Sequence, residues 1–378
     1  MKSGSFVVLA TSTLLVVWLV GVSSLAIESN TIRVPEDYLQ IQQAIDAADP
    51  GDVIQVASGT YFENLEIGKP LRLVGEGSGK TVIANTGTVV KVAHTHNVEI
   101  TGFSVQDGIY GIFLWYSQDI LLENNEISNN TWNFGVWGSS LSHFVHDIDS
   151  SNTVDGKPMY FWVNQHGKQV PNDAGYVALI NCTNMSAENM DLTSNEQGIL
   201  LVSTNNSVIE NVSMTGNDEG LDMRMSHNNT IRKNQLLSIN WRAVYLQDSN
   251  NNTFYENLIL NSTYALSIQG STGNIFYHNN FVNNKDQVYL EASQTLWHNE
   301  EAQEGNYWTD YAGIDADDDG VGDTPHLIDE NNRDSYPLMN PWDTLPYSWW
   351  IPVAGFSAGI GIIILAALVF RRYKSSRK

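Results

Sequence analysis

The sequence has a single cysteine, Cys182, and few basic residues for its length. One cysteine excludes an internal disulfide, so the fold must be stabilised by a large core or by bound metal. All 42 acidic residues lie between Glu28 and Asp343, where only 13 of the 19 basic residues accompany them, giving this body a charge of about −29. Such a charge repels nucleic acid, and we expect no nucleic-acid partner.

Long apolar runs are confined to the two ends of the chain. Lys2 precedes an apolar run that ends in small residues at Ala26, the pattern of a signal peptide over residues 1–26. An uncleaved N-terminal anchor is the alternative. Residues 349–370 form a second, uncharged run, long enough to cross a bilayer of about 30 Å as a helix.

The residues after this second run set the expected orientation. Five basic residues lie within the tail 371–378, and positive flanks stay in the cytoplasm. We therefore expect a single-pass protein of the cell membrane, with its N-terminal body extracellular or periplasmic and its C-terminus cytoplasmic.

The middle of the chain lacks extended helical periodicity and instead repeats itself. An asparagine recurs at intervals of 22, 23, 23 and 22 residues, at Asn189, Asn211, Asn234, Asn257 and Asn279. A short strand-like run follows a small residue in each repeat, at Gly198, Gly220, Ala243 and Ala265. Short strands at fixed spacing stack as the coils of a solenoid. We interpret the asparagines as one column, in which each amide bonds to the next.

These observations predict an all-β fold, a right-handed single-stranded parallel β-helix of about ten coils of 22–23 residues, with a short N-terminal capping helix and one C-terminal transmembrane helix. A leucine-rich repeat has a similar period, but it requires leucine where this chain has Ile, Met, Val and Phe. The order of segments is an N-terminal cap with the first strands (27–80), β-helix repeats (81–300) with an irregular insertion (143–177), and a C-terminal cap (301–345).

The N-terminal cap is expected to contain a short helix. Residues 37–40 read as a capping box, and an apolar helical face follows from Leu39, Ile41, Ala44, Ile45 and Ala48. Such a cap covers the open end of the first coil, where apolar core and unpaired strand edge meet water.

Several blocks of sequence resemble known β-helix proteins. Residues 33–45, 51–54 and 59–64 resemble the N-terminal cap of pectin-lyase-like β-helices. Residues 152–158, 305–311, 322–325 and 334–339 resemble NosD-like proteins, a family described as periplasmic and copper-binding and related to carbohydrate-binding and sugar-hydrolase β-helices. The resemblance covers nearly all of residues 31–341. It implies the fold and a copper-handling role, although a fold does not bring its chemistry with it.

Two kinds of metal site are suggested by the residues. Carboxylates alternate before a glycine at Asp315, Asp317 and Asp319, with Asp323 following, and this pattern favours calcium in the C-terminal cap. An acidic solvated turn is the alternative. Imidazole and thioether ligands suit copper, and the candidates are His94, His96, His143, His146, Met223, Met225 and His227. However, Met223 aligns with core positions of neighbouring coils, and no cluster of three or four ligands has metal-site spacing.

A ligand-binding face follows from the stacking of coils. Counting from the small residue of each repeat, the second and fourth positions point outward, and they include Phe113, Trp115, Trp137, Asp222, Arg224, Tyr245 and Gln247. Exposed aromatic rings beside a carboxylate and a guanidinium suit sugar rings. In the alternative, the insertion at 143–177 covers these rings, which then only pack.

The sequence favours a surface protein that binds carbohydrate or another envelope polymer, or acts as a scaffold. A copper-binding accessory protein is the first alternative, and a polysaccharide lyase or glycoside hydrolase is the second. Asp218, Glu219 and Asp222 with Arg224 form the only dense polar group on a coil, which is little support for paired acid–base catalysis. No catalytic residue is therefore assigned.

Glycosylation triplets are frequent in the sequence. Eight Asn-x-Ser/Thr triplets occur, at Asn129, Asn181, Asn184, Asn205, Asn211, Asn228, Asn251 and Asn261. In an exported chain such triplets accept glycans, but asparagine-rich repeats also generate them by chance, and those that point inward cannot be modified.

Overall fold

The structure, a computed structural model, describes residues 29–342. The signal peptide expected at 1–26 and the apolar run 349–370 lie outside the described residues. Within residues 29–342, no helix is long and apolar enough to cross a membrane.

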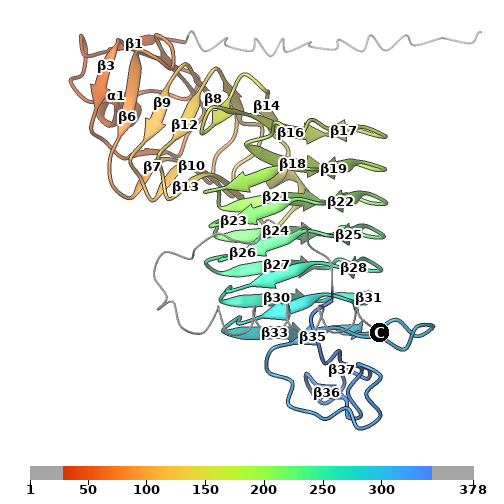
Figure 1. The fold of residues 1–378 in the computed structure, drawn as a ribbon. Helices are drawn as coiled ribbons and strands as arrows, with labels where there is room; N and C mark the ends of the chain where they lie inside the picture. Colours follow the sequence, from red (N-terminus) through yellow and green to blue (C-terminus); the bar gives the residue numbers. More distant parts are fainter. Residues whose placement is uncertain (1–28, 343–378) are drawn as a thin grey trace, which may run out of the picture.

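The described chain winds into a right-handed parallel β-helix of about 12 turns, two more than the sequence suggests. One long sheet runs through all of it (Figure 1). Its 12 strands are, in spatial order, β3 (Gly59–Tyr61), β6 (Thr81–Ala84), β9 (Ser104–Gln106), β12 (Glu126–Ser128), β15 (Thr153–Val154), β16 (Lys157–Val163), β18 (Tyr176–Ile180), β21 (Gln197–Val202), β24 (Glu219–Arg224), β27 (Arg242–Gln247), β30 (Tyr264–Gln269) and β33 (Asp286–Glu291).

Two further sheets complete the N-terminal coils. A six-stranded sheet contains β1 (Thr31–Val34), β2 (Val53–Val56), β5 (Leu71–Gly75), β8 (Val98–Thr101), β11 (Leu121–Glu123) and β14 (Asp147–Ile148). A four-stranded sheet contains β4 (Leu65–Ile67), β7 (Thr88–Ala93), β10 (Tyr110–Trp115) and β13 (Trp132–Trp137).

Two different sheets complete the C-terminal coils. The first contains β17 (Gln169–Val170), β19 (Ser186–Glu188), β22 (Val208–Glu210), β25 (Thr230–Arg232), β28 (Thr253–Tyr255), β31 (Thr272–Tyr277) and β34 (Gln294–Leu296). The second contains β20 (Asp191–Thr193), β23 (Ser213–Thr215), β26 (Gln235–Leu237), β29 (Leu258–Leu260), β32 (Asn280–Val282) and β35 (Tyr307–Trp308).

The two sets of coils meet where the repeat is interrupted. β15 and β16 pair antiparallel, whereas the other pairs within these five sheets are parallel. A 3-10 turn, η1 (Leu141–Phe144), and the short strands β14 to β17 occupy the region expected to be irregular. The N-terminal coils are inclined to the C-terminal coils at this point (Figure 1). We call the junction, where β13 separates from β21, the elbow.

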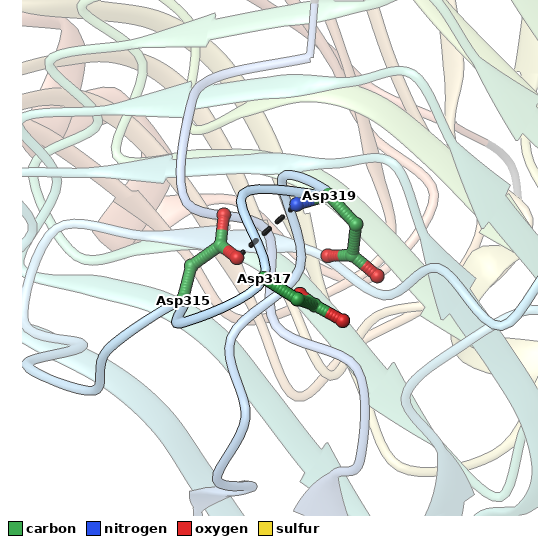
Figure 2. A group of neighbouring side chains, drawn as sticks. All are labelled: Asp315, Asp317 and Asp319. Atoms are coloured by element: carbon green, nitrogen blue, oxygen red, sulfur yellow. Dashed lines mark hydrogen bonds between the residues drawn. The ribbon is translucent and has the colours of Figure 1, made fainter.

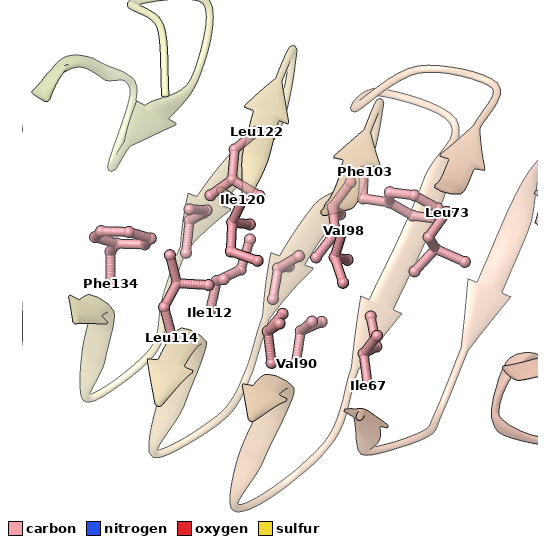
Figure 3. Close-up of a cluster of buried hydrophobic side chains, with 14 of the residues drawn as sticks. Ile67, Leu73, Val90, Val98, Phe103, Ile112, Leu114, Ile120, Leu122 and Phe134 are labelled. Carbon is pink, nitrogen blue, oxygen red and sulfur yellow. The ribbon is translucent and has the colours of Figure 1, made fainter. Parts of the chain in front are cut away.

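The interior of the β-helix is apolar along its whole length. Inward side chains of the N-terminal coils form one continuous cluster, part of which is drawn in Figure 3, and side chains from one face of β18 and β21, such as Ile180 and Leu200, join it. Inward side chains of the C-terminal coils form a second cluster. Met223 belongs to the second cluster, fully buried beside Leu201 and Leu246. The expectation that Met223 is a core residue is confirmed, which removes it from the copper candidates.

The repeating asparagines form two neighbouring columns instead of one. Asn189 and Asn211 lie at exposed left-handed turn positions, where Asn211 Nδ2 donates to Asn189 Oδ1 at 2.7 Å. The strand register places Lys233, and not Asn234, beside Asn211. The single column was wrong by one residue, because the coil here has 22 residues and the two asparagines are 23 apart.

The second column is a buried ladder. Asn257 Nδ2 donates to Asn279 Oδ1 at 2.9 Å and to the Ile231 carbonyl at 2.9 Å, while its Oδ1 accepts from Asn234 Nδ2 at 3.0 Å. Asn279 continues the ladder to Asn306 at 2.9 Å. The inward and outward assignments do not depend on the misplaced column, because they rest on the small residues Gly198, Gly220, Ala243 and Ala265, which share one register.

The N-terminal helix is shorter than expected. α1 (Ile41–Ala47) buries Ile41, Ala44 and Ile45, but Leu39 is 79% exposed. No side chain of the 37–40 segment caps it, so the expected capping box is wrong. The carboxylate of Glu63 accepts from the backbone N–H groups of Ile41 and Gln42, both at 3.0 Å, and satisfies the helix end from a distant part of the chain.

Two of the sequence blocks near the C-terminus meet in space. The buried carboxylate of Asp334 accepts from the Asn306 backbone N–H at 2.7 Å and from Trp308 Nε1 at 2.9 Å. Burial raises the pKa of Asp334 to about 6 in spite of these donors. A β-carbon at Gly305 would collide with the same carboxylate. These contacts fasten the C-terminal segment to the last coil.

Candidate functional site

The aromatic side chains singled out in the sequence lie on the outer face of β10 and β13. The strand register places Phe113 beside Gly135 and Trp115 beside Trp137. Phe113 is 9% exposed, and both tryptophans are half-buried. The rings of Trp115 and Trp137 stack, with centroids 5.5 Å apart and planes inclined by 9°.

The polar candidates lie on a different sheet. Asp222 pairs in register with Tyr245, and Arg224 with Gln247, on β24 and β27 of the long sheet. The sequence suggested one continuous face. That expectation is wrong, because the four-stranded sheet ends at β13 and the long sheet continues past it. The two faces nevertheless meet, because they form the two sides of the elbow.

Backbone pairing holds the start of the elbow and then stops. The Asn133 N–H donates to the Ser194 carbonyl at 2.6 Å, and the Glu196 N–H donates to the Phe134 carbonyl at 3.0 Å. Further along, the Gln197 side chain replaces the missing strand: its Nε2 donates to the Val136 carbonyl at 3.0 Å, and its Oε1 accepts from the Val136 N–H at 3.3 Å. Beyond this point β13 and β21 diverge.

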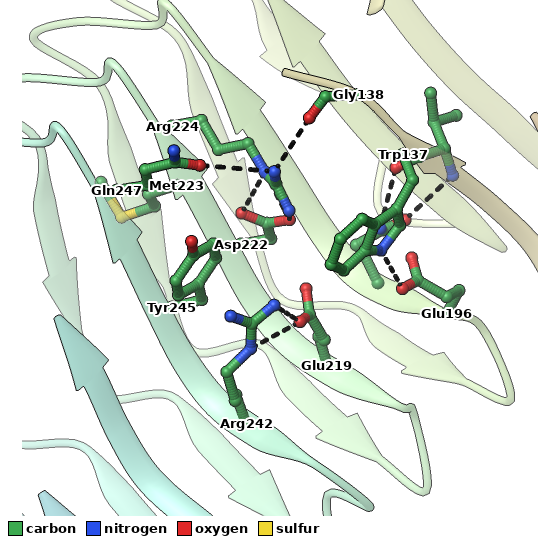
Figure 4. A network of polar contacts seen from close by, with 12 residues as sticks. Trp137, Gly138, Glu196, Glu219, Asp222, Met223, Arg224, Arg242, Tyr245 and Gln247 are labelled. Carbon is green, nitrogen blue, oxygen red and sulfur yellow. Dashed lines mark hydrogen bonds and ion pairs between the residues drawn. The ribbon is translucent and has the colours of Figure 1, made fainter. Parts of the chain in front are cut away.

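An arginine–carboxylate pair fills the space between the diverging strands. Arg224 donates to the carboxylate of Asp222 through Nη2 at 2.8 Å and through Nε at 3.0 Å, and its Nη1 donates to the Gly138 carbonyl at 3.2 Å (Figure 4). Its guanidinium carbon lies 5.1 Å from the Trp137 ring centre and 5.6 Å from that of Phe144. Segment 137–144 therefore covers this pair.

The expectation that these side chains are exposed is wrong at several positions. Asp222 is 0%, Arg224 5% and Tyr245 5% exposed, whereas Gln247 is half-buried. Their direction, outward from their own coil, is as expected, but the neighbouring segment of the same chain covers them. Asp222, like Glu219, is therefore out of reach of a polymer.

A second ion pair connects β24 to the neighbouring strand β27. Arg242 donates to Glu219 through Nε at 2.7 Å and also through Nη2. The Arg242 guanidinium lies between two rings, 3.8 Å from the centre of Trp241 and 3.5 Å from that of Tyr245. Stacking on both faces suits the planar guanidinium and compensates part of its lost hydration.

The elbow has more buried carboxylates than cations. Within residues 29–342, the cations that face Glu196, Asp218, Glu219 and Asp222 are Arg224 and Arg242. All six residues are at least nine-tenths buried. Burial, with the nearby charges of Glu219 and Asp222, raises the pKa of Glu196 well above its usual range. Burial and the charge of Asp222 raise the pKa of Glu219 to about 8. One oxygen each of Glu196 and Glu219 has no hydrogen-bond partner in the described chain. Glu219 keeps its ion pair with Arg242, whereas Glu196, which has no ion pair within residues 29–342, fits this site better as a neutral acid than as a carboxylate.

The tryptophans form a stack across the elbow. The Trp137 ring lies between Trp115 and Trp241, the second at 6.2 Å between centroids and 13° between planes. Trp137 Nε1 donates to Glu196 at 2.6 Å. The inner ring faces are therefore occupied by neighbouring rings. Trp241 is 36% exposed at the end of this stack.

An open cavity of about 560 Å³ lies beside the elbow. Side chains and backbone from both sets of coils line it: Asp107, Gly108, Asn129, Asn130, Thr131, Asp155 and Ser194. Trp132 directly follows the lining residue Thr131, and its half-buried ring packs against Tyr110 at 5.0 Å between centroids. No lysine, arginine or apolar side chain lines the cavity among the described residues.

The acidic loop near the C-terminus brings three of its four candidates together. One carboxylate oxygen each of Asp315, Asp317 and Asp319 lies within 4.8 Å of the others (Figure 2). Asp323 instead accepts from the Ala316 N–H at 2.9 Å. The negative charges of Asp319, Asp323 and Asp315 raise the pKa of the exposed Asp317. Crowded carboxylates are compatible with a calcium ion, the hard cation that such oxygens prefer.

The histidine candidates for copper do not converge. His94 has a left-handed backbone, and His96 forms an isolated bridge with Gln118, so both lie beyond the end of β7. His146 is buried, accepts from the Ile120 N–H at 3.3 Å, and has its pKa lowered to about 3 by burial. His227 Nδ1 accepts from the Asn250 N–H at 3.0 Å. Within residues 29–342, only the aspartate triad brings three possible ligands together.

Sequence reasoning missed the residues that connect the two sides of the elbow. Glu196, Gln197 and Arg242 were not singled out, although each contacts a candidate residue or its strand. One sequence signal was present: Gly135 interrupts an aromatic strand. A β-carbon there would lie 2.5 Å from Glu196 Cβ, so glycine is required for the approach of the second set of coils.

Known proteins share parts of this architecture. A stretch of 118 residues is 29% identical to a protein named cell surface glycoprotein from Methanothermus fervidus, covering 31% of this chain and 20% of that protein. The chain thus spans about one fifth of the length of this relative.

Solved β-helix structures are also similar. The A-module of the mannuronan C-5 epimerase AlgE6 from Azotobacter vinelandii is 18% identical, with a TM-score of 0.33, over 68% of this chain and 74% of that one. An alginate lyase from Paenibacillus is 14% identical, with a TM-score of 0.31, over 71% of this chain and 99% of that one. At these identities the likeness concerns the fold alone.

A protein-family comparison covers most of the chain. Residues 49–159 and 144–313 match a family described as periplasmic copper-binding protein (NosD), and together they span well over half of the 378 residues. The parallel β-helix and the C-terminal segment fastened by Asp334 agree with the blocks of sequence that resemble this family. The chain therefore belongs to the NosD family.

Proposed function

We propose that this protein is an extracytoplasmic surface protein that binds a carbohydrate polymer beside the elbow. The observation that carries the proposal is the open cavity of about 560 Å³, which has polar residues from both sets of coils. Ligand sites are concave, have volumes of about 300–1,000 Å³ and contain a few convergent polar groups.

The chemistry of the lining indicates the kind of polymer. The hydroxyl of Thr131 and the carboxylates of Asp107 and Asp155, all three on exposed residues, offer donors and acceptors to sugar hydroxyls. Because the lining contains two aspartates and no lysine or arginine among the described residues, an anionic uronate would be repelled. The proposed ligand is therefore a neutral or amino sugar polymer.

Trp132 supplies the ring on which a sugar stacks. Trp115 and Trp137 are less suitable, because each lies against two or more other rings. Trp132 has one ring contact among the described residues, with Tyr110. Trp132 is half-buried and follows a lining residue. Its apolar face and the polar cavity together match the two faces of a pyranose ring.

The test is a glycan array with the full-length protein in detergent, comprising neutral, amino and uronic-acid oligosaccharides. We expect neutral or amino sugars to bind, and Trp132→Ala to weaken binding about tenfold, which is about 1.4 kcal/mol. Trp162→Ala is the matched control, because Trp162 is also half-buried but, unlike Trp132, is not adjacent in sequence to a residue that lines the cavity. Binding of uronates alone, or equal affinity of the Trp132→Ala protein, would overturn the proposal.

The proposed location has independent support. The family is described as periplasmic, and the relative from Methanothermus fervidus is named a cell surface glycoprotein. We propose that the apolar run 349–370 anchors the body outside the membrane. Protease added to intact cells or spheroplasts should then digest the body and spare a tag placed after Lys378. Protection of the body would contradict this orientation.

Calcium is proposed to stabilise the acidic loop. The convergence of Asp315, Asp317 and Asp319 supports it, because one cation would relieve their mutual repulsion. We expect a higher melting temperature in calcium than in chelator, and no such difference in an Asp317→Asn protein. Equal melting temperatures of the unsubstituted protein in calcium and in chelator would contradict the proposal.

Copper binding is the second candidate function, and the family description favours it. The dispersed histidines of residues 29–342 give it no preformed site. Stoichiometric copper in the purified protein, measured by elemental analysis and lost on joint replacement of His94 and His143, would support it. A copper content well below one equivalent per protein molecule would contradict this candidate function.

A further inference from the structure

The eight glycosylation triplets occupy turn positions of the coils. Seven of their asparagines are exposed and have left-handed backbones, and only Asn205 is half-buried and lacks this conformation. Asparagine is favoured at such positions because its short polar side chain tolerates a positive φ. Turn geometry alone therefore explains why these triplets are frequent. The triplets differ from one another in the hydrogen bonds that their side chains make.

Most of these amides are already engaged. Asn181 Nδ2 donates to Asn164 Oδ1 at 2.6 Å, and Asn211 Nδ2 donates to Asn189 Oδ1 at 2.7 Å. The amides of Asn129 and Asn184 contact Asp107 and His166. Asn205 Oδ1 accepts from the His227 N–H at 2.7 Å. An amide held in this way is not free to enter a transferase site.

The hydroxyl of the triplet separates the remaining three asparagines. The side-chain amides of Asn228, Asn251 and Asn261 are exposed and make no hydrogen bond within residues 29–342. For Asn261, however, the triplet hydroxyl of Thr263 donates to the Asn240 carbonyl at 2.7 Å. The triplet hydroxyls of Asn228 and Asn251 belong to Thr230 and Thr253, which begin β25 and β28 and are half-exposed.

We propose that Asn228 and Asn251 are the N-glycosylation sites of this protein. They lie in the turns that follow β24 and β27, on consecutive coils about 4.8 Å apart. Their glycans would project side by side from one edge of the long sheet. That edge lies at the opposite end of these strands from the turn that contains Asn261.

The chemistry requires one co-substrate, a lipid-linked oligosaccharide pyrophosphate. The asparagine amide nitrogen forms a bond to the anomeric carbon and loses one proton, while the bond from that carbon to the pyrophosphate oxygen breaks. The lipid pyrophosphate leaves with the bonding electrons, and nothing is oxidised or reduced. The free amide and hydroxyl of one turn are what the transferase must hold.

The experiment is glycopeptide mass spectrometry of full-length protein purified from its own membranes, with electron-transfer fragmentation to locate each glycan. We expect saccharide masses on Asn228 and Asn251, and unmodified Asn129, Asn181, Asn211 and Asn261. Unmodified Asn228 and Asn251, or glycans on the engaged asparagines instead, would overturn the proposal.

Paired variants provide the control for folding. Thr230→Ser retains the hydroxyl and should keep the glycan on Asn228, whereas Thr230→Val retains the shape and should lose it. The Asn251 glycan should persist in both proteins and report that the coil is folded. Loss of the Asn228 glycan in both variants, or in neither, would contradict the assignment.

Discussion

Buried polar groups occur in two settings here, the asparagine ladder of the C-terminal coils and the elbow. In the ladder, Asn257 donates twice and accepts from the coil before it, so its amide is satisfied without any charge. In the elbow, Glu196 and Glu219 each retain an unpartnered oxygen, and four acids share two arginines. A repeat satisfies each group through its identical neighbours, whereas an interruption must be closed by specific residues.

This difference predicts where the molecule is most sensitive. Ladder contacts are many and equivalent, while the elbow depends on single positions. Loss of one elbow contact should therefore affect the whole junction, and loss of one ladder amide should affect mainly its own coil.

The largest effect is expected for Gly135→Ala. Its new methyl group would lie 2.5 Å from Glu196 Cβ, and overpacking of this kind typically costs about 1–3 kcal/mol. Thermal unfolding followed by tryptophan fluorescence measures the loss, because Trp137 and Trp241 lie in the elbow. Gly79→Ala is the control, since nothing lies within 4 Å of its new methyl group. Equal stability of the two variants would contradict the role given to Gly135.

Asn257→Ala should have the next largest effect. It removes a donor to the Ile231 carbonyl and leaves the buried backbone N–H of Asn234 without the acceptor Asn257 Oδ1, a cost of about 1–3 kcal/mol. Asn211→Ala removes an amide from the exposed column and should cost no more than about 0.5 kcal/mol. Denaturant unfolding distinguishes the two. Similar losses of stability would mean that an amide of the buried ladder contributes no more to the free energy of unfolding than an amide of the exposed column.

The smallest effect concerns pH. The folded-state pKa of Glu196 is raised by burial and nearby acids, so its contribution to stability is complete below about pH 4 and is lost as the pH rises through the raised pKa. Glu196→Gln should therefore flatten the decline in stability on the alkaline side. Melting temperatures measured from pH 4 to 9 test this, and an unchanged slope would contradict it.

Glu210→Gln provides a control of opposite sign. Burial raises the pKa of Glu210, but the hydrogen bonds from Arg232 and Lys233 outweigh it and lower the pKa overall. Its stabilising contribution is present above the unfolded-state pKa and is lost as the pH falls. The Glu210→Gln substitution should therefore change only the acidic end of the profile.

The solenoid could be predicted from the sequence because coil length and strand length repeat. The small residues at Gly198 and Gly220 gave the correct register, since a small side chain is needed at each coil there. The asparagine spacing predicted a register that is wrong by one residue, because Asn211 belongs to the exposed column and Asn234 to the buried ladder beside it.

The elbow could not be predicted, because its contacts do not repeat. Glu196 reaches Trp137 across 59 residues, and Arg224 reaches the Gly138 carbonyl across 86. Outward direction is a local property that follows from strand alternation, whereas exposure depends on which distant segment packs there. This is why Asp222 and Tyr245 were assigned the correct direction and the wrong environment.

The buried asparagine ladder has a consequence for how the length of the β-helix can evolve. Each amide binds only the coil directly above and below, so a segment such as 234–256 can be deleted or duplicated and the new neighbours will meet with the same donor and acceptor. The rod is thus free to grow or shrink by whole turns below the elbow. With the anchor proposed at residues 349–370, the distance from the membrane to the cavity becomes a quantity that selection adjusts in steps of about 4.8 Å.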